Sequence, residues 1–270
     1  MSNQKEHIIL ETNELSIGYQ NKKAVHTIQS DVNLQFNKGE LVTILGKNGI
    51  GKSTLLRTIT KVQDALSGTV SINQKDINNY NSLELSKQIS VVLTESLPES
   101  QLTVFELVAL GRQPYTNWVG KLQQEDNEKI LWALEQTDTR DLADKHFYEI
   151  SDGQLQRVLI ARALAQDTEI IMMDEPTAHL DMHHTIKIFQ LLEKLIKETQ
   201  KTIIITSHEV NLAIQYANQI VLLSEEKIDF GSTEELISRN SFNHLFPSEI
   251  VNFNADLKQF VVRKNSSNHN

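Results

Sequence analysis

Two short stretches of the sequence carry residue types that suit phosphate chemistry. The first is GKNGIGKST, residues 46–54, which fits the spacing G-x-x-x-x-G-K-[ST]. Glycines let such a loop curl so that backbone N–H groups point at an anion, and a following helix N-terminus adds partial positive charge. Lys52 can reach the β- and γ-phosphates of a nucleotide, the Ser53 hydroxyl can ligate Mg²⁺, and Thr54 can contact the α-phosphate side. The candidate phosphate-binding residues are Gly46, Lys47, Asn48, Gly49, Ile50, Gly51, Lys52, Ser53 and Thr54.

The second stretch is DTEIIMMDEPTAHLD, residues 167–181, in which four apolar residues lead directly into Asp174 and Glu175. A strand that leaves the core for a solvated turn would also end in polar residues. A phosphate loop, however, needs Mg²⁺ and a group that positions water. Asp174 would hold the magnesium, directly or through water, and Glu175 would orient and deprotonate the attacking water. Together the two stretches predict hydrolysis of a nucleoside triphosphate.

The elements around these stretches indicate an α/β fold. Each of the apolar runs LVTIL, IIMMD and TIIITS is followed by a helical pattern, and such runs suit central parallel strands covered on both faces. β-type segments cluster in the first part of the chain, and about residues 95–165 are expected to form a helical insertion. We therefore expect a P-loop NTPase core with a parallel sheet and an N-terminal antiparallel β subdomain. In KSTLLRTITKV, an apolar stripe predicts a helix that includes Val62.

Composition narrows the class of protein. The chain has 270 residues, 39% apolar and 23% charged, which is ordinary for a globular protein. It has no apolar run of about 18 residues, so no membrane span is expected, and its N-terminus is too polar for a signal peptide. Cysteine is absent, which excludes disulfides and thiolate metal sites. A cytoplasmic location fits best, and the net charge of −9 argues against nucleic acid as the main partner.

A third motif points to a particular family. ISDGQLQR, residues 150–157, resembles the LSGGQ-x-QR signature of ABC-type ATPases. With the phosphate loop, IIMMDEP and His208, the chain is similar over about residues 8–235 to the nucleotide-binding subunit of an ABC transporter. The resemblance implies ATP and Mg²⁺ as ligands and a head-to-tail homodimer. Each ATP would lie between one subunit's phosphate loop and the other's signature residues, here Ser151, Gly153 and Gln154.

The resemblance assigns roles to three further residues. Tyr19 matches an aromatic ring that stacks on adenine, and Asp181 matches a loop that connects the two ATP sites across the dimer. His208 matches the histidine that hydrogen-bonds the γ-phosphate, so Glu175, His208 and Lys52 are the expected catalytic residues. Three further histidines lie near Asp181 in the sequence: His179, His183 and His184. We expect that group to be an exposed, polar helix start rather than a metal cluster.

The sequence departs from the family pattern at two points that concern the site. The glutamine that usually touches Mg²⁺ is missing, and Thr94 followed by Glu95 stands there. Thr94 joins Ser53 and Asp174 as a candidate metal-site residue, although either Thr94 or Glu95 could replace the glutamine. Asp152 replaces a signature glycine, so its carboxylate must point away from the phosphate or be paired.

The segment LTVFELVALGRQPYTNWVGKL, residues 102–122, resembles importers for iron–siderophore, haem and cobalamin. In such importers this region forms a groove for the permease, and Tyr115 and Trp118 would suit an apolar contact there. The expected partners are a second copy of the chain, an integral membrane permease dimer and, indirectly, an extracytoplasmic solute-binding protein. No nucleic acid is expected.

The expected location is the cytoplasmic side of the inner or plasma membrane, as a peripheral subunit. Two alternatives stay open: a soluble ABC ATPase acting on ribosomes or nucleic acid, and an ATP-binding sensor without turnover. Residues 1–240 would form the ABC ATPase domain, and residues 241–270 a C-terminal extension with a polar tail that could add a small strand or helix pair.

Overall fold

The computed structural model describes residues 7–20, 24–93, 100–116, 120–225, 227–245 and 251–262. The strands are β1 (Ile8–Gln20), β2 (Val25–Asn37), β3 (Leu41–Gly46), β4 (Ser67–Ile72), β5 (Lys75–Asp76), β6 (Ile89–Val92), β7 (Ile170–Met173), β8 (Thr202–Ser207), β9 (Gln219–Leu223), β10 (Ile228–Gly231), β11 (Val251–Asn254) and β12 (Gln259–Val262). The α-helices are α1 (Lys52–Ile59), α2 (Ser82–Ser86), α3 (Val104–Ala109), α4 (Gln124–Gln136), α5 (Asp152–Ala165), α6 (Met182–Thr199), α7 (Val210–Tyr216) and α8 (Thr233–Ser238). The 3₁₀ helices are η1 (Ile77–Asn79), η2 (Leu110–Tyr115), η3 (Arg140–Leu142), η4 (Phe147–Glu149) and η5 (Ser241–His244).

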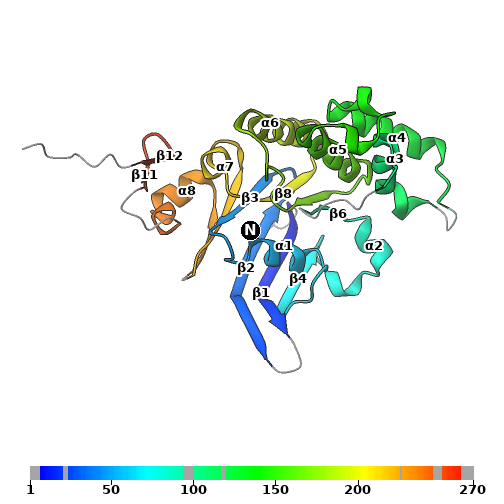
Figure 1. The fold of residues 1–270 in the computed structure, drawn as a ribbon. Coiled ribbons are helices and arrows are strands. Elements are labelled where there is room, and N and C mark those ends of the chain that lie inside the picture. The colour runs from blue at the N-terminus through cyan, green and yellow to red at the C-terminus, as the bar shows by residue number, and fades with distance from the viewer. Residues whose placement is uncertain are drawn as a thin grey trace, which may run out of the picture.

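A six-stranded sheet in the order β10-β9-β3-β8-β7-β6 forms the centre of the molecule. Every pairing in it is parallel except that of β10 with β9. Helices α5, α6 and α7 lie on one side of this sheet, while α1 and the N-terminal strands lie on the other (Figure 1). Because side chains alternate along a strand, Ile171 and Met173 of β7 join the core under the helices, and Ile170 and Met172 join the opposite core. The predicted doubly covered parallel sheet is confirmed.

The first part of the chain forms a second, antiparallel sheet in the order β2-β1-β4-β5. It packs on α1, as the clustered β-type segments predict. The prediction for α1 was wrong at its C-terminal end, because the helix stops at Ile59 and Val62 is 58% exposed. The Thr60 hydroxyl donates to the carbonyl oxygens of Leu56 and Arg57, and Lys61 has φ 58°, so the backbone turns away before another helical turn can form.

The expected helical insertion is observed as α3, η2, α4, η3, η4 and α5. Thr103 caps α3 reciprocally with Glu106, which satisfies backbone donors at that helix start. Inside the insertion, Arg112 donates to the buried carboxylate of Asp126 at 2.8 Å and to the carbonyl oxygen of Ala165 at 2.9 Å. Arg112 thereby attaches η2 and α4 to the C-terminal end of α5.

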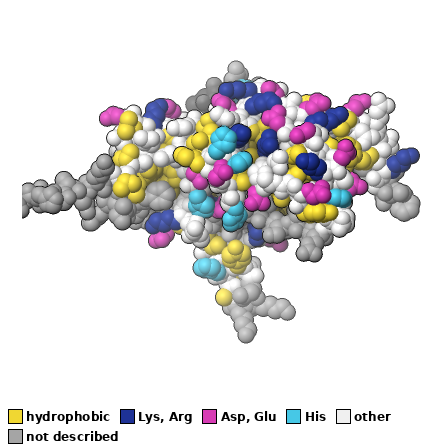
Figure 2. All heavy atoms as spheres, turned by 45° about the horizontal axis from the view of Figure 1, so that its top comes forward, with side chains coloured by type: hydrophobic (Ala, Val, Ile, Leu, Met, Phe, Trp, Pro, Cys, Tyr) yellow, Lys and Arg dark blue, Asp and Glu magenta, His cyan; other side chains and the backbone are white. Residues whose placement is uncertain are grey.

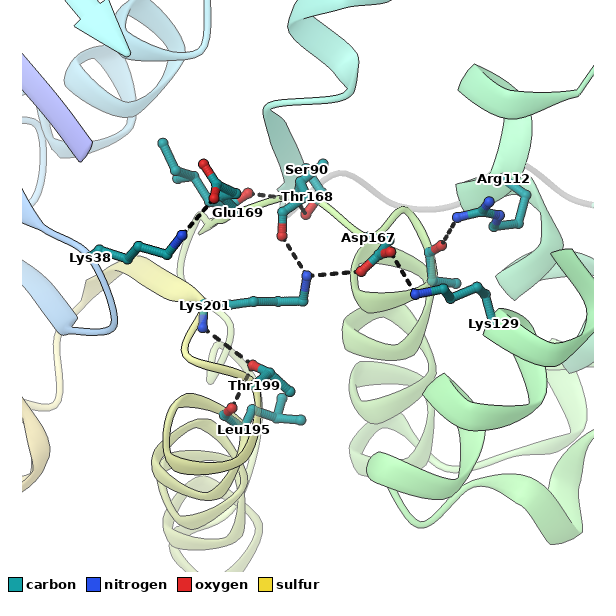
Figure 3. Close-up of polar contacts among 12 residues, drawn as sticks. Lys38, Ser90, Arg112, Lys129, Asp167, Thr168, Glu169, Leu195, Thr199 and Lys201 are labelled. Carbon is teal, nitrogen blue, oxygen red and sulfur yellow. Dashed lines mark hydrogen bonds and ion pairs between the residues drawn. The ribbon is translucent and has the colours of Figure 1, made fainter. Parts of the chain in front are cut away.

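The turn between α5 and β7 is where three parts of the fold meet (Figure 3). Asp167 accepts from Lys129 of α4 at 2.6 Å and from Lys201, just before β8, at 3.1 Å. Glu169 accepts from Lys38, which follows β2, at 2.6 Å. This turn leads into β7, the strand that ends at the acidic pair. It is therefore held by contacts with the helical insertion, the central sheet and the N-terminal sheet.

The end of the described chain forms a hairpin of β11 and β12, which answers the open question about the C-terminal extension. The rings of Phe242, Phe253 and Phe260 contact one another, and the Asn211 amide oxygen accepts from Phe260 N at 2.8 Å. The hairpin is therefore fixed to α7. Across the residues that the structure describes, no helix has both the length and the apolar character that crossing a membrane requires.

Candidate functional site

The phosphate loop lies between β3, which ends at Gly46, and α1, which starts at Lys52. Gly51 is the N-cap of α1 and has φ 110°, a conformation that residues with a side chain rarely adopt. A Cβ atom on Gly51 would also lie 2.6 Å from the Cγ2 atom of Ile28. Glycine is therefore required at this position both by the backbone and by the space available.

Lys52 is held inside the loop. Its side chain is 4% exposed, and its Nζ atom donates to the carbonyl oxygens of Gly46 at 3.0 Å and Lys47 at 3.2 Å. Burial lowers the pKa of Lys52, while the negative charges of Glu175 and Asp174 act in the opposite direction. The ammonium group thus faces the acidic pair from inside the loop, 3.9 Å from the Oε1 atom of Glu175.

The acidic pair stands at the C-terminal end of β7, with hydroxyl groups on two sides. The Asp174 Oδ1 atom accepts from Ser53 Oγ at 2.9 Å and from Thr206 Oγ1 at 2.6 Å. Thr206 Oγ1 in turn accepts from the backbone N–H of Glu175 at 2.8 Å. Sequence reasoning missed Thr206, a hydroxyl at the end of the otherwise apolar β8, which orients both acids.

Glu175 projects toward His208. Its φ of 46° is unusual for a residue with a side chain, and the His208 Nε2 atom lies 2.6 Å from its Oε1 atom. An ionised carboxylate can only accept, so the hydrogen in this contact belongs to the histidine nitrogen. The structure therefore brings together all three predicted catalytic residues, Lys52, Glu175 and His208.

These side chains border a hollow of about 490 Å³. It is lined by Tyr19, His26, Ile28, Asn48, Gly49, Gly51, Lys52, Ser53, Thr54, Glu175 and His208. The Tyr19 hydroxyl lies 3.1 Å from Thr54 Oγ1, and 55% of Tyr19 is exposed, so the ring stands at the rim. Sequence reasoning missed His26 and Ile28, which come from β2; the pairing of Tyr19 with His26 across β1 and β2 places them there.

The oxygen atoms near the loop fit a magnesium ion. Mg²⁺ prefers carboxylate and hydroxyl oxygens, and the Ser53 hydroxyl and the Asp174 carboxylate already lie within hydrogen-bonding distance of each other. Thr94, the third predicted metal-site residue, and Glu95 lie outside the described residues. Within the described ranges, this site included, no group of three or more His, Cys, Asp or Glu side chains is arranged to hold a metal.

The three signature residues lie apart from this hollow, at the start of α5. Ser151 is the N-cap of α5; its hydroxyl accepts from Gln154 N at 3.4 Å, and the Gln154 side chain accepts from Ser151 N at 3.0 Å. Gly153 is buried, whereas Ser151 and Asp152 are exposed. None of these residues lines the hollow that holds Lys52.

The family follows from comparison with known proteins. The model of the ABC transporter family matches residues 29–178, more than half of the chain. The chain belongs to the ABC transporter family. Its fold is that of an ABC ATPase cassette, and the chain is an ABC-type ATPase coupled to transport.

Several curated ABC proteins are similar over most of their length. The chain is 36% identical to an uncharacterized ABC transporter ATP-binding protein of Methanocaldococcus jannaschii, covering 95% of this chain and 88% of that protein. It is 36% identical to the iron(3+)-hydroxamate import ATP-binding protein FhuC of Bacillus subtilis, covering 90% of each. It is 37% identical to the probable siderophore transport system ATP-binding protein YusV of the same organism, covering 88% of this chain and 85% of that one.

Solved ABC structures agree with the fold. One, described as an ABC transporter of metal-chelate type in an inward-facing conformation, superposes with a TM-score of 0.77 at 28% identity and 89% coverage of each chain. The ATP-binding cassette MJ0796, in a dimeric post-hydrolysis state bound to ADP and Pi, gives 0.70 at 30% identity, covering 82% of this chain and 98% of that one. These transport proteins give no support to the alternative of a soluble ABC ATPase acting on ribosomes or nucleic acid.

Proposed function

We propose that the chain is the ATP-hydrolysing subunit of an importer for an iron–siderophore complex. The observation that carries this proposal is the similarity, over about nine-tenths of the chain, to a protein named for iron(3+)-hydroxamate import. Proteins named for siderophore and petrobactin transport are similar over 88% of the chain. These relatives favour iron–siderophore complexes over haem and cobalamin, the other solutes that the sequence brings into consideration.

In the proposed site, the loop of residues 46–54 surrounds the triphosphate of ATP, and Lys52 supplies positive charge toward the β- and γ-phosphates. Ser53 and Asp174 would hold Mg²⁺, which when bound neutralises charge on the phosphates. Glu175 accepts the proton of the attacking water. Without nucleotide, the N–H group of His208 donates to Glu175; when ATP is bound, the same N–H group would donate to the γ-phosphate instead.

Two copies of the chain would complete two sites. Ser151, Gly153 and Gln154 lie away from the hollow of their own subunit, so in a head-to-tail homodimer they contact the ATP of the partner. The free N–H groups at the start of α5 and the Ser151 hydroxyl suit a γ-phosphate. The dimeric structure of a similar cassette with ADP and Pi supports this arrangement. Binding of two ATP molecules would close the dimer, and hydrolysis would reopen it.

A second hollow, of about 410 Å³, suits contact with a permease on the cytoplasmic side of the membrane. It lies between α2 and β6 and is lined in part by Leu85, Ile89 and Val91. Beside it, the Lys87 ammonium group lies 5.0 Å from the centre of the Tyr115 ring, so the aromatic side chain that we propose for permease contact lies close to this hollow. Trp118 lies outside the described residues. The extracytoplasmic solute-binding protein would reach this chain only through the permease.

The test uses a chain with Glu175→Gln, which binds ATP but hardly hydrolyses it. The tagged chain is expressed in its own host, membranes are solubilised with ATP present, and the co-purifying proteins are identified. We expect a permease with many membrane spans, encoded beside a binding protein for an iron chelate. Recovery only with ribosomal or nucleic-acid partners would refute the importer and leave the ATPase chemistry standing.

A further inference from the structure

One histidine outside the proposed catalytic group makes two contacts that join separate parts of the site. His184 lies in the first turn of α6, whose N-cap is Asp181. Its backbone N–H donates to Asp181 Oδ1 at 2.8 Å, and its Nδ1 atom lies 2.9 Å from each carboxylate oxygen. The backbone bond alone would cap the helix. The ring adds a second anchor, which fixes the orientation of the Asp181 carboxylate.

Another edge of the same ring meets the signature. A Cβ atom on Gly153 would lie 2.7 Å from His184 Cδ2, closer than real Cβ atoms approach other atoms, and 3.1 Å from Cγ, which is also tight. The ring therefore fills the space that a side chain at position 153 would need. One side chain thus connects the loop before α6 with the buried start of α5. In a space-filling view, histidine side chains gather beside acidic ones on this face of the molecule (Figure 2).

The loop that ends at Asp181 begins at Glu175, and backbone hydrogen bonds form two turns within it. Ala178 N donates to the carbonyl oxygen of Glu175 at 3.0 Å, and Leu180 N to that of Thr177 at 3.3 Å. These two consecutive turns connect the hydrolytic carboxylate to the aspartate that His184 holds. Hydrogen bonds from the backbone and the ring of His184 also keep the pKa of Asp181 below its usual range.

We propose that His184 is a positioning residue that couples Glu175 to the signature of the same subunit. The inference rests on the proposed function, in which Glu175 acts on the subunit's own ATP and Gly153 faces the partner's. His184 then provides a physical connection between the two ATP sites through a single subunit. His184 does not line the hollow that holds Lys52, so its effect should fall on the rate of hydrolysis and on cooperativity rather than on ATP binding.

Two substitutions separate this role from simple capping. In His184→Asn, the Asn amide nitrogen takes the place of Nδ1, and its oxygen takes the place of Cδ2, so both contacting edges are kept. His184→Ala removes both. Lys187→Ala is the matched control, because Lys187 is an exposed residue of the same helix. Each variant is the full chain, purified with its permease, and hydrolysis is measured against ATP concentration together with the melting temperature.

We expect His184→Ala to lower kcat at least about fivefold, the lower end of usual coupling strengths, with KM for ATP changed less than about twofold and a Hill coefficient near 1. His184→Asn should recover most of the rate, and Lys187→Ala should match the unaltered chain. Unchanged kcat in His184→Ala, a loss confined to KM, or equal losses in the Ala and Asn variants would overturn the positioning role. Failure of the unaltered transporter to hydrolyse ATP would instead refute the proposed function, and the positioning role with it.

Discussion

At the scale of single residues, the acidic pair depends on groups that come from several strands. Glu175 is contacted by His208 at 2.6 Å and by Lys52 at 3.9 Å, and Asp174 by Ser53 and Thr206. The carboxylate of Glu175 is therefore oriented before any water reaches it. Chemistry at this position should be sensitive to the charge of the side chain far more than to its size.

Glu175→Gln tests that sensitivity. The amide keeps the volume and the contact with His208 but cannot take a proton from water, so kcat for ATP hydrolysis should fall by about 10² to 10⁴. ATP affinity should stay within about twofold of the unaltered chain. Phosphate release and titration with a fluorescent ATP analogue measure the two effects. Glu193→Gln, whose side chain on α6 is half-exposed and lies away from the hollow, serves as control. If Glu175→Gln lowered the affinity for ATP and left kcat unchanged, the assignment of Glu175 as the general base would be contradicted.

Lys52→Met tests the phosphate loop. The apolar side chain keeps the length of lysine without its buried charge, and burial disfavours that charge, as the lowered pKa of Lys52 indicates. ATP affinity should fall at least about tenfold, whereas the free energy of unfolding without ATP should fall by no more than about 1–3 kcal/mol, the cost of leaving the carbonyl oxygens of Gly46 and Lys47 without this donor. Binding is followed by calorimetry and stability by urea unfolding, with Lys197→Met on α6 as control. If Lys52→Met destabilised the chain but left its affinity for ATP unchanged, the proposed role of Lys52 in phosphate binding would be disproved.

The sequence allowed prediction of the residues whose spacing along the chain defines them. The loop of residues 46–54 and the pair Asp174 and Glu175 are of this kind. Thr206 and His26 were missed because β8 and β2 reach the site only through long-range strand pairing. Their hydroxyl and imidazole groups carry no local pattern that distinguishes them from ordinary strand residues.

At the scale of elements, a larger side chain at Gly153, in the first turn of α5, should lower the stability of the folded chain, although glycine to alanine usually raises it in a helix. Replacing a helical glycine with alanine ordinarily stabilises a protein by about 0.5–1 kcal/mol. At Gly153 the added Cβ would meet the His184 ring, so Gly153→Ala should destabilise. In a chain that also carries His184→Ala the space is open, and the same change should stabilise. Urea unfolding of the four chains measures the coupling; additive effects would show that the ring does not fill this space.

The turn before β7 should give stability a particular pH dependence. Burial raises the pKa of Asp167, but hydrogen bonds from Lys129 and Lys201 outweigh this effect and bring that pKa below its usual value. Because the folded-state pKa is depressed, the stabilisation is present above the unfolded value of about 3.9 and is lost as pH falls through the folded value.

Asp167→Asn should therefore lower stability at neutral pH and flatten its decline below about pH 4. Urea midpoints between neutral and acid pH measure this, and Asp144→Asn, an exposed aspartate of the same insertion, is the control. Parallel pH profiles for Asp167→Asn and the unaltered chain would show that the lysine contacts do not stabilise the junction shown in Figure 3.

Elements with strong periodicity or apolar runs were predictable, and the ends of elements were less so. The central strands follow from their apolar runs, but the end of α1 before Val62 depends on the Thr60 hydroxyl, which competes with the next helical turn. The C-terminal hairpin was undecided because its alternation is weak. Its position depends on the contact of Asn211 with Phe260, far apart in sequence.

At the scale of the whole molecule, assembly should depend on ATP. The full chain with Glu175→Gln should double its mass in light scattering when ATP and Mg²⁺ are added and return to one copy when ATP is removed. Adding Ser151→Ala, which removes the hydroxyl proposed to contact the partner's γ-phosphate, should weaken this association at least about threefold, because one hydrogen bond to a charged group is lost. A single copy at every ATP concentration would contradict the head-to-tail dimer.

The donors of the proposed nucleotide site already have acceptors within the protein. Ser53 donates to Asp174, His208 donates to Glu175, and Lys52 donates to carbonyl groups of its own loop. A phosphate that enters must replace these partners, so the enthalpy of binding is a difference between two sets of hydrogen bonds and not the sum of one. A nucleotide bound through such an exchange gains less net binding free energy than its number of contacts suggests, so it can also be released readily. A transport cycle that repeats requires this reversible binding more than it requires high affinity.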